Sequence, residues 1–110
     1  MTTWRDVMLY KAYTHTWMLY VPGLPNYLDY PEILGLRAPL PAFVLNDSED
    51  PLFTLKEMKA ADGILREVYQ KAGAPENYKC SFYPGGHKFD AAMQKDAFEW
   101  LDNVMKGAKK

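Results

Sequence analysis

The fold of this chain is decided by two turns, Leu45-Asn46-Asp47-Ser48-Glu49-Asp50-Pro51-Leu52-Phe53 and Phe82-Tyr83-Pro84-Gly85-Gly86-His87-Lys88-Phe89-Asp90. In the first, a short apolar run ends in a turn that carries three carboxylates. In the second, an apolar run ends in a glycine-rich turn that carries a histidine. A helical pattern separates the two, and alternation of strands with helices is typical of a parallel α/β sheet. The sequence therefore predicts an acid turn and a base turn, each at the end of a parallel strand.

The strand before the acid turn and the helix after it have clear expected boundaries. The run Ala42-Phe43-Val44-Leu45 is apolar and bounded by turn residues, as expected of a strand that is buried on both faces. The helix is predicted to begin at Thr54, which would form a capping box with Glu57, and to end at Gly73. One apolar stripe of this helix is expected to face the sheet: Met58, Ala61, Leu65, Val68 and Ala72.

A second strand and a second helix follow the same plan. The strand is predicted over residues 78–83, and Asp90 can cap a last helix that stops at Gly107. Buried parallel strands need neighbours on both sides, and a bare strand edge is a site for pairing with other chains. We therefore expect a parallel α/β sheet that is incomplete by itself. The apolar stripe of the last helix is Met93, Ala97, Trp100 and Val104.

The chain is expected to form one partial domain over residues 1–110. Residues 1–28 are an aromatic-rich lead-in, and residues 29–106 bear the acid and the base. We expect the lead-in rings to pack against another surface. The alternative is an aromatic wall of a pocket for an acyl group or a sugar. Residues 29–35 are predicted to form one or two helical turns that stop at Gly35. The rings of the first thirty residues are Trp4, Tyr10, Tyr13, Trp17, Tyr20, Tyr27 and Tyr30.

Charge and composition exclude several classes of protein. The net charge of −1 gives no reason to expect nucleic acid or an anionic membrane as a partner. The single cysteine, Cys80, excludes an internal disulfide and a multi-cysteine zinc site. No apolar run approaches the ~18 residues that a membrane span requires. The beginning of the sequence lacks the layout of a signal peptide, which favours the cytoplasm by default.

His87 is the strongest candidate for chemistry. It follows a predicted strand on a Pro-Gly-Gly turn, where a side chain can be directed into a cleft. An imidazole with a pKa near ~6.5 can take up a proton and return it at neutral pH. The alternative interpretation is a surface histidine in a turn, and the matching acid turn upstream favours the catalytic one.

Asp50 is the carboxylate that we expect to orient His87. It would hold one ring nitrogen, fix the tautomer and stabilise the imidazolium without taking the proton itself. Asp47 and Glu49 compete for that role, or are solvated turn residues, with Asp47 bonded to its own backbone in an Asx-turn. A metal site made of the three carboxylates is disfavoured because the loop lacks the ligand pattern and glycine of a calcium loop.

A nucleophile is missing from the pattern. The two serines, Ser48 and Ser81, lie in the acid turn and in the predicted final strand, and neither sits in Gly-x-Ser-x-Gly. Cys80 falls inside the same strand and is expected to be a buried structural thiol rather than a nucleophile. His15 has no carboxylate or second ligand nearby in the sequence, so we interpret it as a packing or surface histidine.

The acid turn, the base turn and the segment before them together resemble the C-terminal part of an α/β-hydrolase of the dienelactone hydrolase and acetyl-xylan-esterase-like branch. The resemblance covers residues 29–106 and includes the stretches at 29–41, 45–50, 68–74, 83–90 and 93–101. Asp47 departs from the glycine that is usual in that acid turn. Met1-Thr2-Thr3-Trp4 resembles an internal segment, which would make Met1 an internal methionine and leave the native N-terminus and localisation open.

The resemblance implies the function of a larger parent protein. That parent would be a serine hydrolase of the carboxylesterase or acetyl-esterase type, which acts on a small-molecule ester without a cofactor or metal. Asp50 and His87 would be its triad acid and base, and this chain would be inactive alone because the nucleophile is absent. The alternative is a non-catalytic α/β-hydrolase-like module that forms homo-oligomers or other complexes through the exposed sheet edge.

Overall fold

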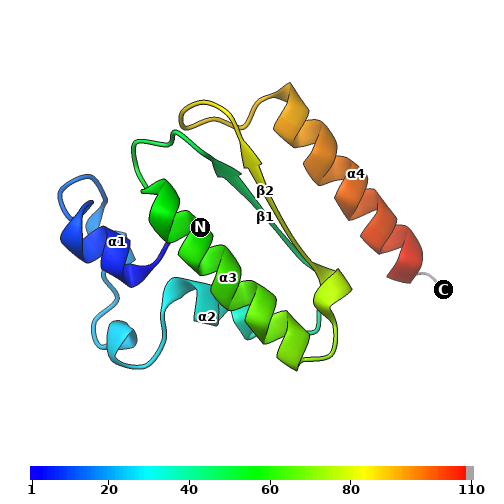
Figure 1. Ribbon diagram of the computed structural model, residues 1–110, viewed down its shortest axis with the longest axis horizontal. Coiled ribbons are helices and arrows are strands. Elements are labelled where there is room, and N and C mark those ends of the chain that lie inside the picture. Colours follow the sequence, from blue (N-terminus) through cyan, green and yellow to red (C-terminus); the bar gives the residue numbers. More distant parts are fainter. Residues whose placement is uncertain (109–110) are drawn as a thin grey trace.

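The computed structural model, which describes residues 1–108, has a two-stranded parallel sheet with helices packed on it (Figure 1). At its centre β1 (Ala42–Asp47) pairs in parallel with β2 (Tyr78–Tyr83), with Ala42 opposite Tyr78 and Asp47 opposite Tyr83. Helix α3 (Leu55–Lys71) connects the two strands, and α4 (Ala91–Ala108) follows β2. The predicted order of strand, helix, strand and helix is confirmed, and so are the parallel pairing and the bounds of β2.

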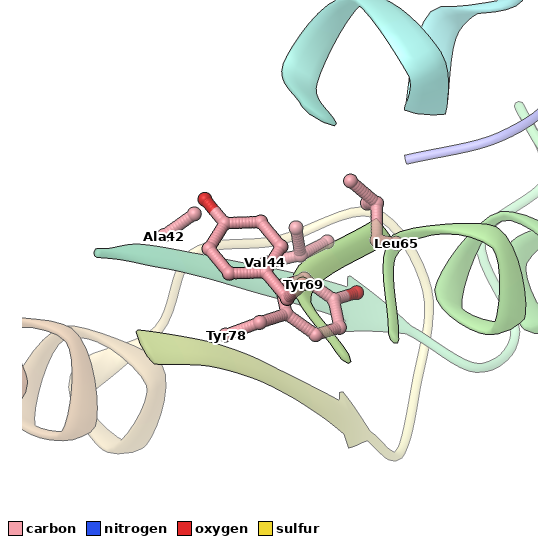
Figure 2. Packing of buried hydrophobic residues seen from close by; sticks show 5 residues of the cluster. All are labelled: Ala42, Val44, Leu65, Tyr69 and Tyr78. Carbon is pink, nitrogen blue, oxygen red and sulfur yellow. The ribbon is translucent and has the colours of Figure 1, made fainter. Parts of the chain in front are cut away.

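The two long helices cover opposite faces of the sheet. On one face, Leu65 and Tyr69 of α3 pack on β1 and β2 (Figure 2). On the other, Trp100 of α4 packs against Phe43, with ring centroids 5.6 Å apart. Successive residues of a strand point to opposite faces, so one short strand supports both helices. The buried cluster on the α3 face contains Ala42, Val44, Leu65, Tyr69 and Tyr78.

The predicted apolar stripe of α3 is confirmed in its first half, where Met58, Ala61 and Leu65 are almost fully buried. It is wrong at the C-terminal end, where Tyr69 enters the core and Ala72 is exposed. Tyr69 stacks on Tyr78 at 5.4 Å between ring centroids, and its hydroxyl donates to the Leu40 carbonyl at 2.6 Å. A tyrosine is tolerated in this core because its polar end finds a partner there.

The capping box predicted at Thr54 and Glu57 is absent. Thr54 is the N-cap residue of α3, but its hydroxyl donates to Asp6 Oδ1 at 2.9 Å and its backbone N–H donates to Asp6 Oδ2 at 2.9 Å. Glu57 instead accepts hydrogen bonds from Arg5 and Thr3. A charged carboxylate from the lead-in thus takes the role predicted for Glu57, because an anion is favoured at a helix N-terminus.

Asp90 caps α4 as predicted, since its Oδ1 accepts from the backbone N–H of Met93 at 3.1 Å. The stripe of α4 also faces the sheet as predicted: Met93 is buried, and Ala97, Trp100 and Val104 are half-buried. The helix continues past Gly107 to Ala108, one residue beyond the predicted stop.

The lead-in contains α1 (Trp4–Leu9) and two short 3-10 turns, Trp17–Leu19 and Leu24–Asn26, before α2 (Tyr30–Gly35). The helical turns expected before Gly35 are confirmed, with a capping box between Asp29 and Glu32. Within the described range, no helix has the length and hydrophobicity needed to cross a bilayer.

The aromatic rings of the lead-in divide into two groups. Trp4 packs edge-on against Tyr20 and Tyr30, each at 5.6 Å between ring centroids, as the packing prediction requires. Tyr10, Tyr13, Trp17 and Tyr27 project from the surface, with exposed fractions between 58% and 103%. The described chain offers no surface for these four rings, so their packing against another surface stays a prediction.

Candidate active site

The structure brings Asp50 and His87 together. Nδ1 of His87 lies 2.8 Å from Oδ2 of Asp50, although 37 residues separate them in the sequence. Only 7% of the Asp50 side chain is exposed, whereas 66% of the His87 side chain is exposed. The carboxylate is thus held within the protein and the imidazole is presented at its surface. The catalytic roles of the two residues remain a prediction.

The acid turn is shaped by Asp50 itself. Its Oδ1 accepts the backbone N–H of Leu52 at 2.8 Å, and its own N–H donates to the carbonyl of Asp47 at 3.2 Å. The side-chain bond from residue i to the N–H of residue i+2 is an Asx-turn. The Asx-turn predicted at Asp47 is therefore found at Asp50, where it fixes the carboxylate that holds His87.

The lead-in braces the acid turn from outside. The ammonium group of Lys11 donates to the Pro51 carbonyl at 2.7 Å, and Nε2 of His15 lies 2.9 Å from the Leu52 carbonyl. The His15 ring also stacks on Phe53, at 5.1 Å between centroids. His15 is a packing residue, as predicted, but its position against the acid turn is not visible in the sequence.

The base turn depends on a glycine. Gly85 has φ = +100°, a conformation that a residue with a Cβ atom adopts only with strain. A Cβ atom there would also lie 3.3 Å from the ammonium group of Lys88, which pairs with Asp90 at 2.9 Å. The Pro-Gly-Gly sequence thus allows the sharp reversal that places His87 beside the acid turn.

The other two carboxylates of the acid turn have different surroundings. Glu49 is exposed and fits the prediction of a solvated turn residue. Asp47 is 6% exposed, and its Oδ2 accepts the backbone N–H of Lys88 at 3.0 Å. The prediction of a solvated Asp47 is therefore wrong. Within residues 1–108, no group of three or more His, Cys, Asp or Glu side chains has the geometry to hold a metal ion.

The bond from Asp50 raises the pKa of His87 above its ordinary value of 6.5. The hydrogen bond is the main cause, and the charge of Asp50 and then that of Asp47 add to it, while partial loss of water opposes it. A raised pKa means that the imidazolium is favoured, which is what a base needs after it has accepted a proton. Solvent screens the effect because the ring is largely exposed.

A pocket of about 310 Å³ opens beside the pair, near the lower limit of roughly 300 Å³ for small-molecule sites. Its apolar wall comes from α3, α4 and the two turns: Leu45, Phe53, Met58, Phe89 and Met93. The polar groups on its wall include Asn46, whose Oδ1 accepts the Met1 ammonium at 2.6 Å. A second, mainly apolar hollow of about 430 Å³ shares Met1 and Phe53 with it.

None of the residues that line this pocket within the described chain is a serine, a threonine or a cysteine. Ser48 is part of the acid turn, where its N–H donates to the Tyr83 carbonyl at 2.8 Å. Burial raises the pKa of the Cys80 thiol to about 11, and its Sγ accepts from Nδ2 of Asn46 at 3.4 Å. A thiol with such a pKa is protonated at neutral pH and is a poor nucleophile. In the described chain the pocket therefore contains a carboxylate and an imidazole, but no serine, threonine or cysteine side chain.

The structure adds a buried polar network that no local pattern indicates. Asp6 is fully buried and joins α1 to Thr54 at the start of α3, and Glu57 is 1% exposed beneath Arg5 and Thr3. These partners lie about 50 positions apart in sequence, for example 54 between Thr3 and Glu57. A buried carboxylate requires such partners. The network holds the lead-in against the helix that follows the acid turn.

Comparison of the chain with models of protein families, with curated proteins and with solved structures found no match. The chemistry of the acid–base pair and of its pocket is thus the basis for the functional proposal.

Proposed function

We propose that this chain supplies the acid and the base of a serine hydrolase, and that the nucleophile comes from a polypeptide segment outside these 110 residues. One observation carries the proposal: Asp50, buried and fixed by its own turn, binds Nδ1 of the surface-exposed His87 at 2.8 Å. In a triad the carboxylate selects the tautomer in which Nδ1 carries the proton, which leaves Nε2 as the base.

The proposed reaction is the hydrolysis of a small-molecule ester. Nε2 of His87 accepts the proton of the incoming serine hydroxyl as its oxygen attacks the ester carbonyl, and the imidazolium then returns this proton to the leaving alcohol, which leaves an acyl-serine. Nε2 next accepts a proton from a water molecule that attacks the acyl-serine, and returns it to the serine oxygen as the carboxylic acid leaves. Asp50 stabilises the imidazolium during these steps without taking its proton. Two backbone N–H groups outside this chain would stabilise the oxyanion.

The fold proposed for the complete hydrolase is that of the α/β-hydrolases, in the dienelactone hydrolase and acetyl-xylan-esterase-like branch. The support is the order of elements: β1 ends in the acid turn, α3 follows, β2 ends in the base turn, and α4 follows. In that fold the acid precedes the histidine along the chain, and the nucleophile precedes both. The edge of β1 away from β2 has no strand beside it in the described chain, which leaves room for the strands that would carry the nucleophile.

The test is the reactivity of the purified chain beside its His87→Ala variant. With p-nitrophenyl acetate we expect the same rate from both proteins, and with a fluorophosphonate probe we expect no labelling. Stoichiometric labelling that depends on His87 would show that the chain contains its own nucleophile and would contradict the proposal.

A second experiment tests the source of the nucleophile. The DNA upstream of the Met1 codon should contain an in-frame Gly-x-Ser-x-Gly about one strand and one helix earlier. Co-expression of that segment with this chain should restore ester hydrolysis that depends on both the serine and His87. Stop codons or intergenic sequence in that stretch would contradict an upstream source.

The second candidate function is an interaction or oligomerisation module without catalysis. It is favoured by the open edge of β1 and by large apolar side chains on the surface of α4, where Phe98 and Met105 are more than half exposed. An edge strand and an exposed apolar surface both favour association. Sedimentation decides: a well-folded monomer at low micromolar concentration would exclude self-association as the function.

A further inference from the structure

Asp47 is a buried carboxylate of the acid turn. Of the other two carboxylates in this turn, Asp50 bonds to His87 and Glu49 is exposed to solvent. Asp47 is the last residue of β1 and lies opposite Tyr83, the last residue of β2. Both strands therefore end at the level of this side chain. A carboxylate that is 94% buried requires partners, because burial removes the water that would stabilise its charge.

The base turn is held to the acid turn on both sides of His87. On the N-terminal side, the Gly85 carbonyl accepts the backbone N–H of Glu49 at 3.1 Å. On the C-terminal side, the backbone N–H of Lys88 donates to Oδ2 of Asp47 at 3.0 Å. The first bond joins two backbones and is available to any sequence. The second bond exists only because residue 47 has a side chain that accepts.

The other oxygen of Asp47 has no partner. Oδ1 is the one buried side-chain nitrogen or oxygen in the described chain that lacks a hydrogen bond. An unsatisfied buried polar group costs about 1–3 kcal/mol, and more when it is charged. A role limited to holding the Lys88 N–H would be met by a neutral amide. The carboxylate thus leaves one buried oxygen unsatisfied beside the pocket that Asp47 and His87 both line.

We propose that Asp47 is a positioning residue for His87: its Oδ2 fixes the backbone that follows the histidine, and its second oxygen lies buried beside the pocket that Asp47 and His87 both line. The role in catalysis rests on the function proposed above, whereas the geometric role does not. The pair of Asp50 and His87 is then supported by a second carboxylate that contacts the base turn rather than the ring.

Several charged groups lie near the His87 ring, and a test must separate the effect of Asp47 on the ring from the effects of the others. Asp50 binds Nδ1 directly, and the Met1 ammonium and Lys88 lie on the wall of the same pocket. Lys88 is neutralised in part by Asp90 at 2.9 Å, and Glu49 is exposed in the same turn. Asp47 is a buried carboxylate that does not contact the ring. Glu49 is a carboxylate of the same turn that is exposed, so it provides the control for a general effect of charge.

The experiment is an NMR titration of His87 combined with hydrogen exchange of the Lys88 amide in three variants. Asp47→Asn can still accept the Lys88 N–H, so exchange should remain slow while the pKa of His87 falls, because the charge of Asp47 contributes to raising it. Asp47→Ala removes both, so exchange should accelerate and the pKa should fall further toward 6.5. Glu49→Gln should leave both quantities close to those of the unmodified chain.

Two results would overturn the proposal. In the first, Asp47→Asn leaves the pKa of His87 unchanged, and this variant decides the matter even if Asp47→Ala does not fold. In the second, Glu49→Gln lowers the pKa as much as Asp47→Asn, which would show a general effect of net charge. Neither measurement uses ester hydrolysis, so failure of this proposal is distinguishable from failure of the proposed function.

Discussion

Helices α3 and α4 have similar lengths and cover the two faces of the same sheet, yet one is enclosed and the other is not. In α3, Met58, Ala61, Leu65 and Tyr69 are all less than 2% exposed. In α4, Met93 is buried, but Phe98, Leu101 and Met105 are 44% to 60% exposed. The difference arises because α3 has further helices beside it: α2 packs against α3, and α1 lies at its N-terminal end, and both are on the side of the molecule away from α4 (Figure 1).

Asp50 and His87 differ in burial in the same way as α3 and α4. Asp50 lies before α3 and is braced by the lead-in through Lys11 and His15, and it is buried. His87 lies before α4 and is two-thirds exposed. Asp50 thus lies on the side of the molecule where α3 is well buried, and His87 lies on the side where α4 is largely exposed.

The largest difference between α3 and α4 is expected when one leucine of each helix is shortened to alanine. Leu65→Ala in α3 should lower the free energy of unfolding by about 3 kcal/mol, because it leaves a cavity in a closed core. Leu101→Ala in α4 should lower it by less than about 0.5 kcal/mol, since the side chain is 44% exposed. Chemical denaturation measures both. Equal losses would show that α4 is as firmly packed as α3.

The buried network under α1 provides a second contrast. Glu57→Gln should destabilise the chain by about 1–3 kcal/mol, because Arg5 and Thr3 lose a buried charged acceptor. These partners lower the pKa of Glu57, so its contribution is present above the ordinary carboxyl pKa and is lost as the pH falls through the lowered value.

The matched control for Glu57 is Asp102→Asn in α4, which breaks an exposed pair with Lys106 at 3.1 Å. Its effect should stay below about 0.5 kcal/mol and disappear at high salt. A loss as large as that of Glu57→Gln would contradict the assignment of the network to the closed side.

Two tyrosine hydroxyls allow single hydrogen bonds on the α3 side and the α4 side to be compared. Tyr69→Phe should cost about 1 kcal/mol, because the Leu40 carbonyl loses the donor that satisfies it at 2.6 Å. Tyr83→Phe breaks a bond of the same length to Asp96 of α4 and should cost less, because both residues are only half-buried and water can replace the hydroxyl. Urea titrations of the two variants would detect a reversed order.

The smallest expected effect is the pH dependence contributed by the acid–base pair. The folded-state pKa of His87 is raised, so its contribution to stability is fully present below 6.5 and is lost as the pH rises through the raised value. Unfolding measured between pH 5 and pH 9 should therefore show a shallow decline that His87→Ala abolishes. A decline that survives in the variant would assign the pH dependence to another group.

Much of the fold was predictable because it depends on local periodicity. The apolar runs and helical stripes lead directly to β1, α3, β2 and α4, and Asp90 is a helix cap by position alone. The meeting of Asp50 and His87 followed from the resemblance of two turns, each of which would be weak alone. For the strands, the helices and the cap, neighbouring residues carry the whole signal, and each of the two turns is likewise recognised from its own residues.

What escaped prediction depends on contacts between distant residues. The cap of α3 comes from Asp6, because a carboxylate 48 positions away displaces the local partner Glu57. Tyr69 enters the core because the carbonyl of Leu40 lies within reach of its hydroxyl. Asp47 is buried because the base turn folds back onto it and offers the N–H of Lys88. No window of sequence around any of these residues contains the partner that decides its position.

The hydrogen bond between Asp50 and His87 is tested most directly by an NMR titration of His87, in the purified chain and in its Asp50→Asn variant. If the chain holds a preassembled acid–base pair, His87 titrates above 6.5 with a strongly downfield Nδ1 proton, and Asp50→Asn abolishes the downfield proton and returns the pKa toward 6.5. A His87 that titrates at its ordinary value in the unmodified chain, and does not respond to Asp50→Asn, would show that the pair does not form and would contradict the account.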